Sequence, residues 1–276
     1  MIAALSEATL ARVTEAWQVM SGLPDAFRTP GSTITGIVED ALTCPPGWCG
    51  YVRIGDRTVM TAPGPEPAAR LSETAFRSAP DRDRLGPAML AYLDHEVIGV
   101  PPTVSVSRFA ADDPMITELE RSVGTAEAGE AAVSDVISPV FAITEAGLTV
   151  SSGAAPAAGA PPGRTPPGGT PPAGDGSIVV AAAGYRPWLD RLAHLSVLTR
   201  TGYRGRGLAT LVAAAAISHA QAAGLTPQWR ALASNVASLR VATRLGFVVV
   251  GEQISAPLGV AVAGEQISAR RDEPSR

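Results

Sequence analysis

Hydrophobic residues recur at helical spacing near the start of the chain and alternate with polar residues soon afterwards. Leu10, Val13 and Trp17 fall on one face of a helix expected over residues 6–20. Alternation on both sides of a Gly-Asp pair predicts a β-hairpin over residues 51–60. The N-terminal elements expected from the pattern are thus a helix at 6–20, a hairpin at 51–60, and helices at 67–78 and 85–93.

The second half of the chain shows longer apolar runs. One at residues 192–199 predicts a central strand, and an alanine-rich run at 208–223, followed by Gly224, predicts a helix with a glycine stop. The other elements expected are a helix at 114–123, adjacent antiparallel strands at 138–143 and 178–185, a strand at 229–232, a short helix from residue 236 and a strand from residue 248.

Two segments differ from this pattern. In residues 153–175, 19 of 23 residues are Pro, Gly or Ala, so the segment has too little apolar surface to offset its ordering entropy and is expected to be a mobile loop between two strands. The six residues 251–256 recur unchanged at 264–269, which a duplication of the last strand explains.

The composition is that of a globular protein, with 276 residues, 46% hydrophobic content and a formal net charge of −4. The arginines form no long run, so no nucleic-acid partner is expected. Cys44 and Cys49 have no histidines beside them and are expected to be reduced thiols with no metal. No secretory signal is apparent, and the longest apolar stretch, residues 208–217, is far shorter than the ~20 residues of a membrane span. A soluble, cytoplasmic protein with no membrane partner is expected.

Arginine and glycine residues gather between the strand at 192–199 and the helix at 208–223. Gly205 and Gly207 lack a Cβ, so their N–H groups can approach a ligand closely, beside the positive end of the helix. The pattern favours an anion, and a pyrophosphate fits it. A Walker loop needs a lysine, which the chain lacks, and the dinucleotide fingerprint fails because Thr210 stands in place of its third glycine.

Arg204-x-x-Gly207-x-Ala209 resembles the Arg/Gln-x-x-Gly-x-Gly/Ala motif with which members of the GNAT (general N-acetyltransferase) superfamily hold the pyrophosphate of acetyl-CoA. Asn235-Val-Ala-Ser238, followed by Leu245-Gly246-Phe247, is similar to the family's second signature, Asn-x-x-Ala/Ser and a helix that ends in Gly-Phe. Asn235 also suits the N-cap of the short helix, so capping and cofactor contact remain alternatives.

The resemblance implies an α/β (α+β) fold in which helices flank a mixed, mainly antiparallel sheet, over residues 111–276. It is absent before about residue 110. Residues 1–110 are therefore expected to form an additional α/β region of unassigned role, either a degenerate acyltransferase-like lobe or a lid that builds the acceptor pocket.

The resemblance also implies the contacts to acetyl-CoA. Backbone groups at the end of the central strand would bind the pantetheine and the thioester oxygen, and the loop after it would bind the pyrophosphate. The implied contact residues are Val197, Leu198, Thr199, Arg204, Gly205, Arg206, Gly207, Leu208, Ala209, Asn235 and Ser238.

His194 is the expected general base, because it lies on the central strand just before the cofactor segment and histidine titrates near neutral pH. A structural histidine is the alternative reading. His95 and His219 are weaker candidates, and His219, late in the alanine-rich helix, is expected to face solvent.

The family's usual general acid is a tyrosine, whose position holds Ala242 here. Tyr185, Tyr203 or water would then have to protonate the leaving thiolate. The resemblance implies acetyl transfer from acetyl-CoA to a primary amine, expected to belong to a small molecule. Two alternatives stay open: a catalytically inactive acyl-CoA-binding sensor or partner-binding module, and a protein or peptide N-acetyltransferase. The sequence leaves open the identity of the acceptor and the formation of a homodimer.

Overall fold

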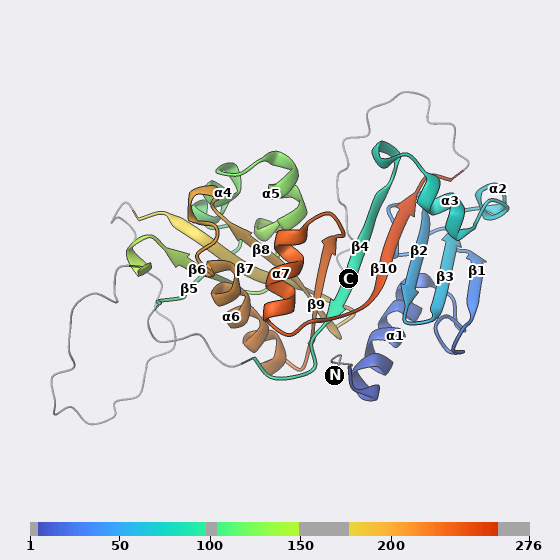
Figure 1. Cartoon of the computed structure of the whole chain (residues 1–276), viewed down its shortest axis with the longest axis horizontal. Coiled ribbons are helices and arrows are strands. Elements are labelled where there is room, and N and C mark those ends of the chain that lie inside the picture. Colours follow the sequence, from blue (N-terminus) through green and yellow to red (C-terminus); the bar gives the residue numbers. More distant parts are fainter. Residues whose placement is uncertain (1–4, 98–103, 149–176, 259–276) are drawn as a thin grey trace. The chain divides into compact units, whose positions relative to one another are not determined.

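The computed structural model describes residues 5–97, 104–148 and 177–258 (Figure 1). The chain divides into two compact units. Unit 1 comprises Met1–Ala91, Arg230–Val236 and Val249–Arg276, and unit 2 comprises Tyr92–Trp229 and Ala237–Val248. Unit 1 therefore combines segments from both ends of the sequence.

Unit 1 is built on strands in the order β1-β3-β2-β10-β4. β1 runs parallel to β3, whereas β2 pairs antiparallel with β3 and with β10. Its elements are α1 (Glu7–Ser21), β1 (Thr33–Ile37), β2 (Cys49–Ile54), β3 (Arg57–Ala62), α2 (Pro65–Ala68), α3 (Glu73–Ser78), the 3₁₀ turn η1 (Asp81–Asp83), β4 (Leu85–Tyr92) and β10 (Val248–Ala256).

The first helix and the hairpin confirm the hydrophobic pattern. Ser6 caps α1 by accepting from the N–H of Thr9 at 3.3 Å, and Val13 and Trp17 are fully buried. The hairpin between β2 and β3 turns at Gly55, whose φ is 60°. Glycine adopts this left-handed backbone without the steric cost of a Cβ, which explains its place in the turn.

Two expected helices of the N-terminal part are wrong. Residues 85–93 contain strand β4, in which Leu90, Ala91 and Tyr92 are all buried; a strand buried on both faces gives a continuous apolar run that resembles a buried helix. The helix expected at 67–78 is two short helices, α2 and α3. Ser72 begins the second by accepting from the N–H of Ala75 at 3.1 Å, and an N-cap serine of this kind starts a new helix.

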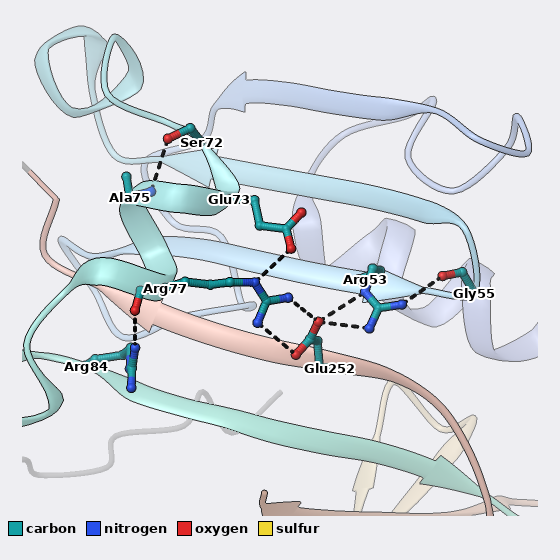
Figure 2. A network of polar contacts seen from close by, with 8 residues as sticks. All are labelled: Arg53, Gly55, Ser72, Glu73, Ala75, Arg77, Arg84 and Glu252. Atoms are coloured by element: carbon teal, nitrogen blue, oxygen red, sulfur yellow. Dashed lines mark hydrogen bonds and ion pairs between the residues drawn. The ribbon is translucent and has the colours of Figure 1, made fainter.

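A buried carboxylate joins three elements of unit 1 (Figure 2). Glu252 of β10 accepts from Arg53 of β2 at 3.1 and 2.9 Å and from Arg77 of α3 at 2.6 Å. Arg77 also donates to Glu73 at 2.7 Å. Burial of the carboxyl opposes its ionisation, but the bonds from the two arginines outweigh burial, and the pKa of Glu252 lies below its ordinary value. The network fixes β10 to β2 and α3.

Unit 2 is built on strands in the order β9-β8-β7-β6-β5. All recorded neighbours are antiparallel except β8 and β9, which are parallel. Its elements are β5 (Ser107–Phe109), α4 (Pro114–Arg121), α5 (Thr125–Ala131), the 3₁₀ turns η2 (Val133–Asp135), η3 (Ala146–Leu148) and η4 (Thr201–Tyr203), β6 (Val140–Thr144), β7 (Val179–Trp188), β8 (Leu192–Thr199), α6 (Leu208–Ala222), β9 (Thr226–Leu232) as far as Trp229, and α7 (Val236–Arg244) from Ala237.

Helices α4 and α6 cover opposite faces of this sheet. Ile116 of α4 packs with Ala182 of β7 and Leu198 of β8 in one apolar cluster. His219 of α6 instead contacts Tyr185 of β7. Because side chains alternate along a strand, residues 182 and 185 of β7 point to different faces.

The expected fold class is confirmed: helices flank a mixed, mainly antiparallel sheet. The central strand occupies residues 192–199 as predicted, and α6 ends one residue before its predicted limit, with Gly224 in the left-handed conformation. The Pro/Gly/Ala-rich segment 153–175 and the second sequence copy at 264–269 lie outside the described residues, so their predictions are untested.

Candidate functional site

Two glycines with left-handed backbone shape the loop between β8 and α6. The φ angle is 75° at Gly205 and 79° at Gly207, a region that residues with a side chain rarely adopt. Both glycines are exposed, and no heavy atom lies within 4 Å of the place that a Cβ would take at either. The loop therefore keeps its backbone accessible where another residue would project a side chain.

Consecutive backbone N–H groups lack a backbone acceptor at this loop, among the residues that the structure describes. The N–H groups of residues 205–209 have no acceptor within the part of the chain that the structure describes. Gly207 is the N-cap residue of α6 and no side chain caps the helix, while Thr210 and Leu211 donate back to the Gly207 carbonyl at 3.1 and 3.3 Å. Free N–H groups at the positive end of a 15-residue helix suit an anion with several oxygens.

The arginines of the loop are held by neighbouring groups. Arg204 donates through Nε to the Thr199 carbonyl at 3.2 Å and forms an ion pair with Glu127 of α5. The guanidinium of Arg206 lies 5.0 Å from the ring centroid of Tyr203. Both arginines are exposed, so each keeps donors available at the loop surface.

Strands β8 and β9 part before β8 ends. Their recorded pairing runs from Leu192–Thr226 to His194–Gln228, although β8 continues to Thr199. The N–H of Thr226 donates to the Arg191 carbonyl at 2.9 Å, which shows that the backbone groups of odd-numbered β8 residues face the β9 side. Because these groups alternate along a strand, Val197 and Thr199 present theirs beyond the last pair.

Leu198 and Thr199 lie at this open end but differ in surroundings. The Leu198 side chain belongs to the apolar cluster beneath α4, and backbone alternation directs its N–H and carbonyl toward β7. Thr199 places its carbonyl against Arg204, and its hydroxyl is buried with no partner among the described residues. The end of β8 therefore offers polar groups on the side away from β7.

His194 lies at the last pair of the β8–β9 ladder. Its Nδ1 is 3.1 Å from the Oε1 atom of Gln228, and its ring stacks on Trp188 of β7, with 4.5 Å between centroids and 19° between planes. The ring is partly exposed. The structure therefore holds His194 by one edge and one face near the open end of β8.

The expectation that His219 faces solvent is wrong. Its Nδ1 lies 2.8 Å from the Tyr185 hydroxyl, and its ring contacts Phe141 with 5.4 Å between centroids. Burial lowers the pKa of His219, and the charge of Arg108 lowers it further. Sequence spacing could not show which side of α6 lies on the sheet.

The two tyrosines considered as proton donors are both engaged elsewhere. Tyr185 pairs with Leu195 across the β7–β8 ladder, so it lies on the α6 face, opposite His194. Burial raises the pKa of Tyr185. Tyr203 donates its hydroxyl proton to Glu145, and this bond is the main cause of its raised pKa. Neither hydroxyl is free to protonate a thiolate beside His194 without exchanging its partner.

The second signature lies at and within α7. Asn235 immediately precedes the helix, and Gly246 follows it with a φ of 87°. Ser238 accepts a hydrogen bond from Trp229 Nε1 at 2.9 Å. A Cβ on Gly246 would lie 2.4 Å from the His95 ring, so close packing as well as conformation requires glycine there. Ala242 is buried, which leaves no polar side chain at the tyrosine position.

The sequence of this region matches a known family. Residues 173–253 match the sequence profile of the family described as GNAT acetyltransferase. This part of the chain is therefore similar to GNAT acetyltransferases. The match includes the cradle loop, defined here as residues 200–209, and both sequence signatures. A comparison with curated proteins gave no match.

Several solved structures that are similar to this chain are described as GNAT-family or GCN5-related acetyltransferases. A putative GNAT-family acetyltransferase from Novosphingobium aromaticivorans shares 21% identity over 64% of this chain and 68% of its own, with a TM-score of 0.41. A GCN5-related N-acetyltransferase-like protein from Streptococcus suis shares 16% identity over 90% of this chain and 98% of its own, with a TM-score of 0.44. A GNAT-family acetyltransferase from Colwellia psychrerythraea shares 14% identity over 63% of this chain and 56% of its own, with a TM-score of 0.38. The chain thus spans little more than half of this last protein.

Sequence reasoning missed several side chains around the candidate site. Glu127 pairs with Arg204, Glu145 with Tyr203, and Gln228 and Trp188 with His194. None of them carried a signal in the sequence, because their proximity depends on the fold.

Two absences complete the description of the residues around the candidate site. Among the residues described, no group of three or more histidine, cysteine or acidic side chains is arranged to hold a metal ion. Within the same residues, no helix combines the length and the apolarity that a bilayer span requires.

Proposed function

We propose that the protein transfers an acetyl group from acetyl-CoA to the primary amine of a small molecule. The observation that carries this proposal is the row of unbonded N–H groups at residues 205–209 beside two exposed arginines. A diphosphate would accept from these donors, with charge-assisted bonds from Arg204 and Arg206. Leu208 and Ala209 would contribute their N–H groups at the first turn of α6.

The open edge of β8 suits the rest of the donor. Backbone groups of Val197 and Thr199 face the side that β9 leaves unpaired, and they would bond the amides of pantetheine and polarise the thioester carbonyl. Leu198 would support them from the apolar cluster. Asn235 and Ser238 are proposed contacts on the family resemblance alone.

The chemistry needs a neutral amine and a protonated leaving group. The amine nitrogen attacks the thioester carbonyl carbon, the carbon–sulfur bond breaks, and the amine proton goes to His194 while the thiolate takes a proton from water. His194 is partly exposed at the open end of β8, which suits this role. The proposed partners are acetyl-CoA and the amine, in the cytoplasm, without nucleic acid, membrane or metal.

An acyl-CoA-binding module without catalysis is the second candidate. It is favoured by the buried Ala242 in place of a tyrosine and by the bonded hydroxyls of Tyr185 and Tyr203. Such a module would retain the cradle loop and lack a protein proton donor.

The two functions separate in one experiment. Calorimetry measures acetyl-CoA binding, and thiol release is followed with acetyl-CoA across a panel of primary amines. We expect binding and amine-dependent thiol release, with His194→Gln retaining binding while kcat/KM falls by about 10²–10⁴-fold. Binding without turnover of any amine would favour the inactive module, and absence of binding would reject both.

A further inference from the structure

The His194 ring is held by a buried relay that reaches across two strands. Gln228 and Tyr92 are both 0% exposed. Gln228 Oε1 lies 3.1 Å from His194 Nδ1, and Gln228 Nε2 donates to the Tyr92 hydroxyl at 2.7 Å. Both ends of the amide are therefore bonded, and a buried amide that rotated would lose bonds that water cannot replace.

The relay fixes where the imidazole carries its proton. A carboxamide oxygen only accepts hydrogen bonds, so Nδ1 must be the protonated nitrogen of a neutral His194 that bonds Gln228 Oε1. Nε2 is then the nitrogen with the lone pair. When Nε2 takes a proton, Nδ1–H still donates to the same oxygen, so the bond persists in both states of the ring.

We propose that Gln228, itself oriented by Tyr92, is the positioning residue that makes His194 Nε2 the base of the reaction. This inference rests on the proposed function. Trp188 adds to it, because a ring stacked at 4.5 Å cannot turn freely about its Cβ–Cγ bond. His194 and Gln228 also form the last pair of the β8–β9 ladder, so their hydrogen bond lies where the two strands separate.

The charged groups near His194 must be known before the effect of an added carboxylate on its pKa can be interpreted. Arg186 of β7 stands opposite His194 in the β7–β8 ladder, and its guanidinium donates to the Asp135 carbonyl at 2.5 Å. Glu127 of α5 is paired with Arg204. Gln228 and Tyr92 bring no formal charge, so Gln228→Glu introduces a carboxylate at the atom that faces the ring.

The first test measures the tautomer and needs no turnover. Proton–nitrogen NMR correlations resolve ring nitrogens, the chain has only 3 histidines, and His194→Gln identifies the His194 signals by their loss. We expect the Nδ1–H tautomer in the unaltered protein and a shift toward Nε2–H in Gln228→Met. Gln221→Met, which makes the same change at a residue bonded to the His95 carbonyl, should leave the His194 signals unchanged.

The second test follows the pH dependence. Gln228→Glu should raise the measured pKa of His194 by about 1–3 units, because the carboxylate favours the charged ring. The rising limb of kcat should move to higher pH by the same amount, and Tyr92→Phe should produce a smaller loss than Gln228→Met. In Gln228→Met, kcat should fall at least about tenfold with the KM for acetyl-CoA unchanged.

Two outcomes would overturn the inference in folded variants: an Nε2–H tautomer in the unaltered protein, or a pH limb in Gln228→Glu that stays in place while the His194 pKa rises. Failure of the proposed function looks different. An Nδ1–H ring with no turnover of any amine would remove His194 as a base while leaving its hydrogen bond as described.

Discussion

Arg204 of the cradle loop already has protein partners, which a bound diphosphate would have to replace. Its guanidinium bonds the Thr199 carbonyl and pairs with Glu127, and the two side chains of that ion pair are 43% and 42% exposed. A diphosphate would therefore compete with a carboxylate for the same donor. Because exposed ion pairs contribute only ~0–1 kcal/mol, this competition should be mild.

Separate substitutions of Arg204 and Glu127 distinguish the attraction of Arg204 for the diphosphate from the competition by Glu127 for the same guanidinium. Arg204→Ala should weaken acetyl-CoA binding about ten- to hundredfold, since it removes charge-assisted hydrogen bonds of ~1.5–3 kcal/mol. Glu127→Gln should tighten binding by no more than about fivefold. Titration calorimetry at two salt concentrations measures both. Equal affinity in all three proteins would mean that the diphosphate binds elsewhere.

Gly207 tests the backbone side of the loop. Gly207→Val should lower acetyl-CoA affinity at least about tenfold, because the φ of 79° disfavours any side chain and the added atoms project over the helix N-terminus. Gly202→Val is the matched control, since that glycine has no left-handed φ and has open space around its Cβ position. If Gly207→Val binds as tightly as the control, the N–H row is not the ligand site.

At the scale of elements, the Glu252 network fixes β10 in unit 1. Its carboxylate is 8% exposed and carries bonds from both Arg53 and Arg77. Glu252→Gln should lower the free energy of unfolding by about 1–3 kcal/mol, because it leaves two arginines beside a neutral group. Urea denaturation measures the change. Glu73→Gln, at an exposed carboxylate, should cost less than about 1 kcal/mol.

The same network predicts an acid response. The folded pKa of Glu252 lies below its unfolded value near 4.5, so its contribution is present above that pH and disappears as pH falls through the folded pKa. The unaltered protein should therefore lose more stability between about pH 5 and pH 3 than Glu252→Gln does. If the urea midpoints of the unaltered protein and of Glu252→Gln fell by the same amount over this pH range, the Glu252 carboxylate would make no contribution to the pH dependence of stability.

Elements with a distinct local signal were predictable from the sequence. The strand at 192–199 lies between polar turns, and α1 has a capping serine and a glycine stop, so pattern and structure agree. β4 was mistaken for a helix because its last three residues, Leu90, Ala91 and Tyr92, are all buried and show no period of two. Among the candidate site residues, the two glycines of the cradle loop carry a signal in the sequence because glycine favours left-handed backbone, which both adopt. The Gln228 relay carries none, since it depends on strand register.

At the scale of the whole molecule, the two units do not follow the order of the sequence. The sequence suggests a boundary near residue 110, which remains a prediction. In the structure, β10 lies in the unit of the N-terminal residues, and its Gly251–Ala256 pair one by one with Ile54–Cys49 of β2. Ile254 and Ala256 also pack with Tyr51 and Phe76 in one buried cluster. A cut at 110/111 therefore separates a buried strand from its partners.

This arrangement predicts the behaviour of a fragment. Residues 111–276 alone should aggregate or melt without cooperativity, because β10 would expose a side chain such as Ile254, whose burial stabilises by about 1.5–3 kcal/mol, and would leave Glu252 without Arg53 and Arg77. Co-expression with residues 1–110 should restore a soluble complex, and Glu252→Gln in the larger fragment should weaken that complex. Size-exclusion chromatography and thermal denaturation follow these outcomes. If residues 111–276 alone melted cooperatively at the temperature of the full chain and bound acetyl-CoA equally well, the N-terminal residues would be a separable appendage and β10 would need no partner from them.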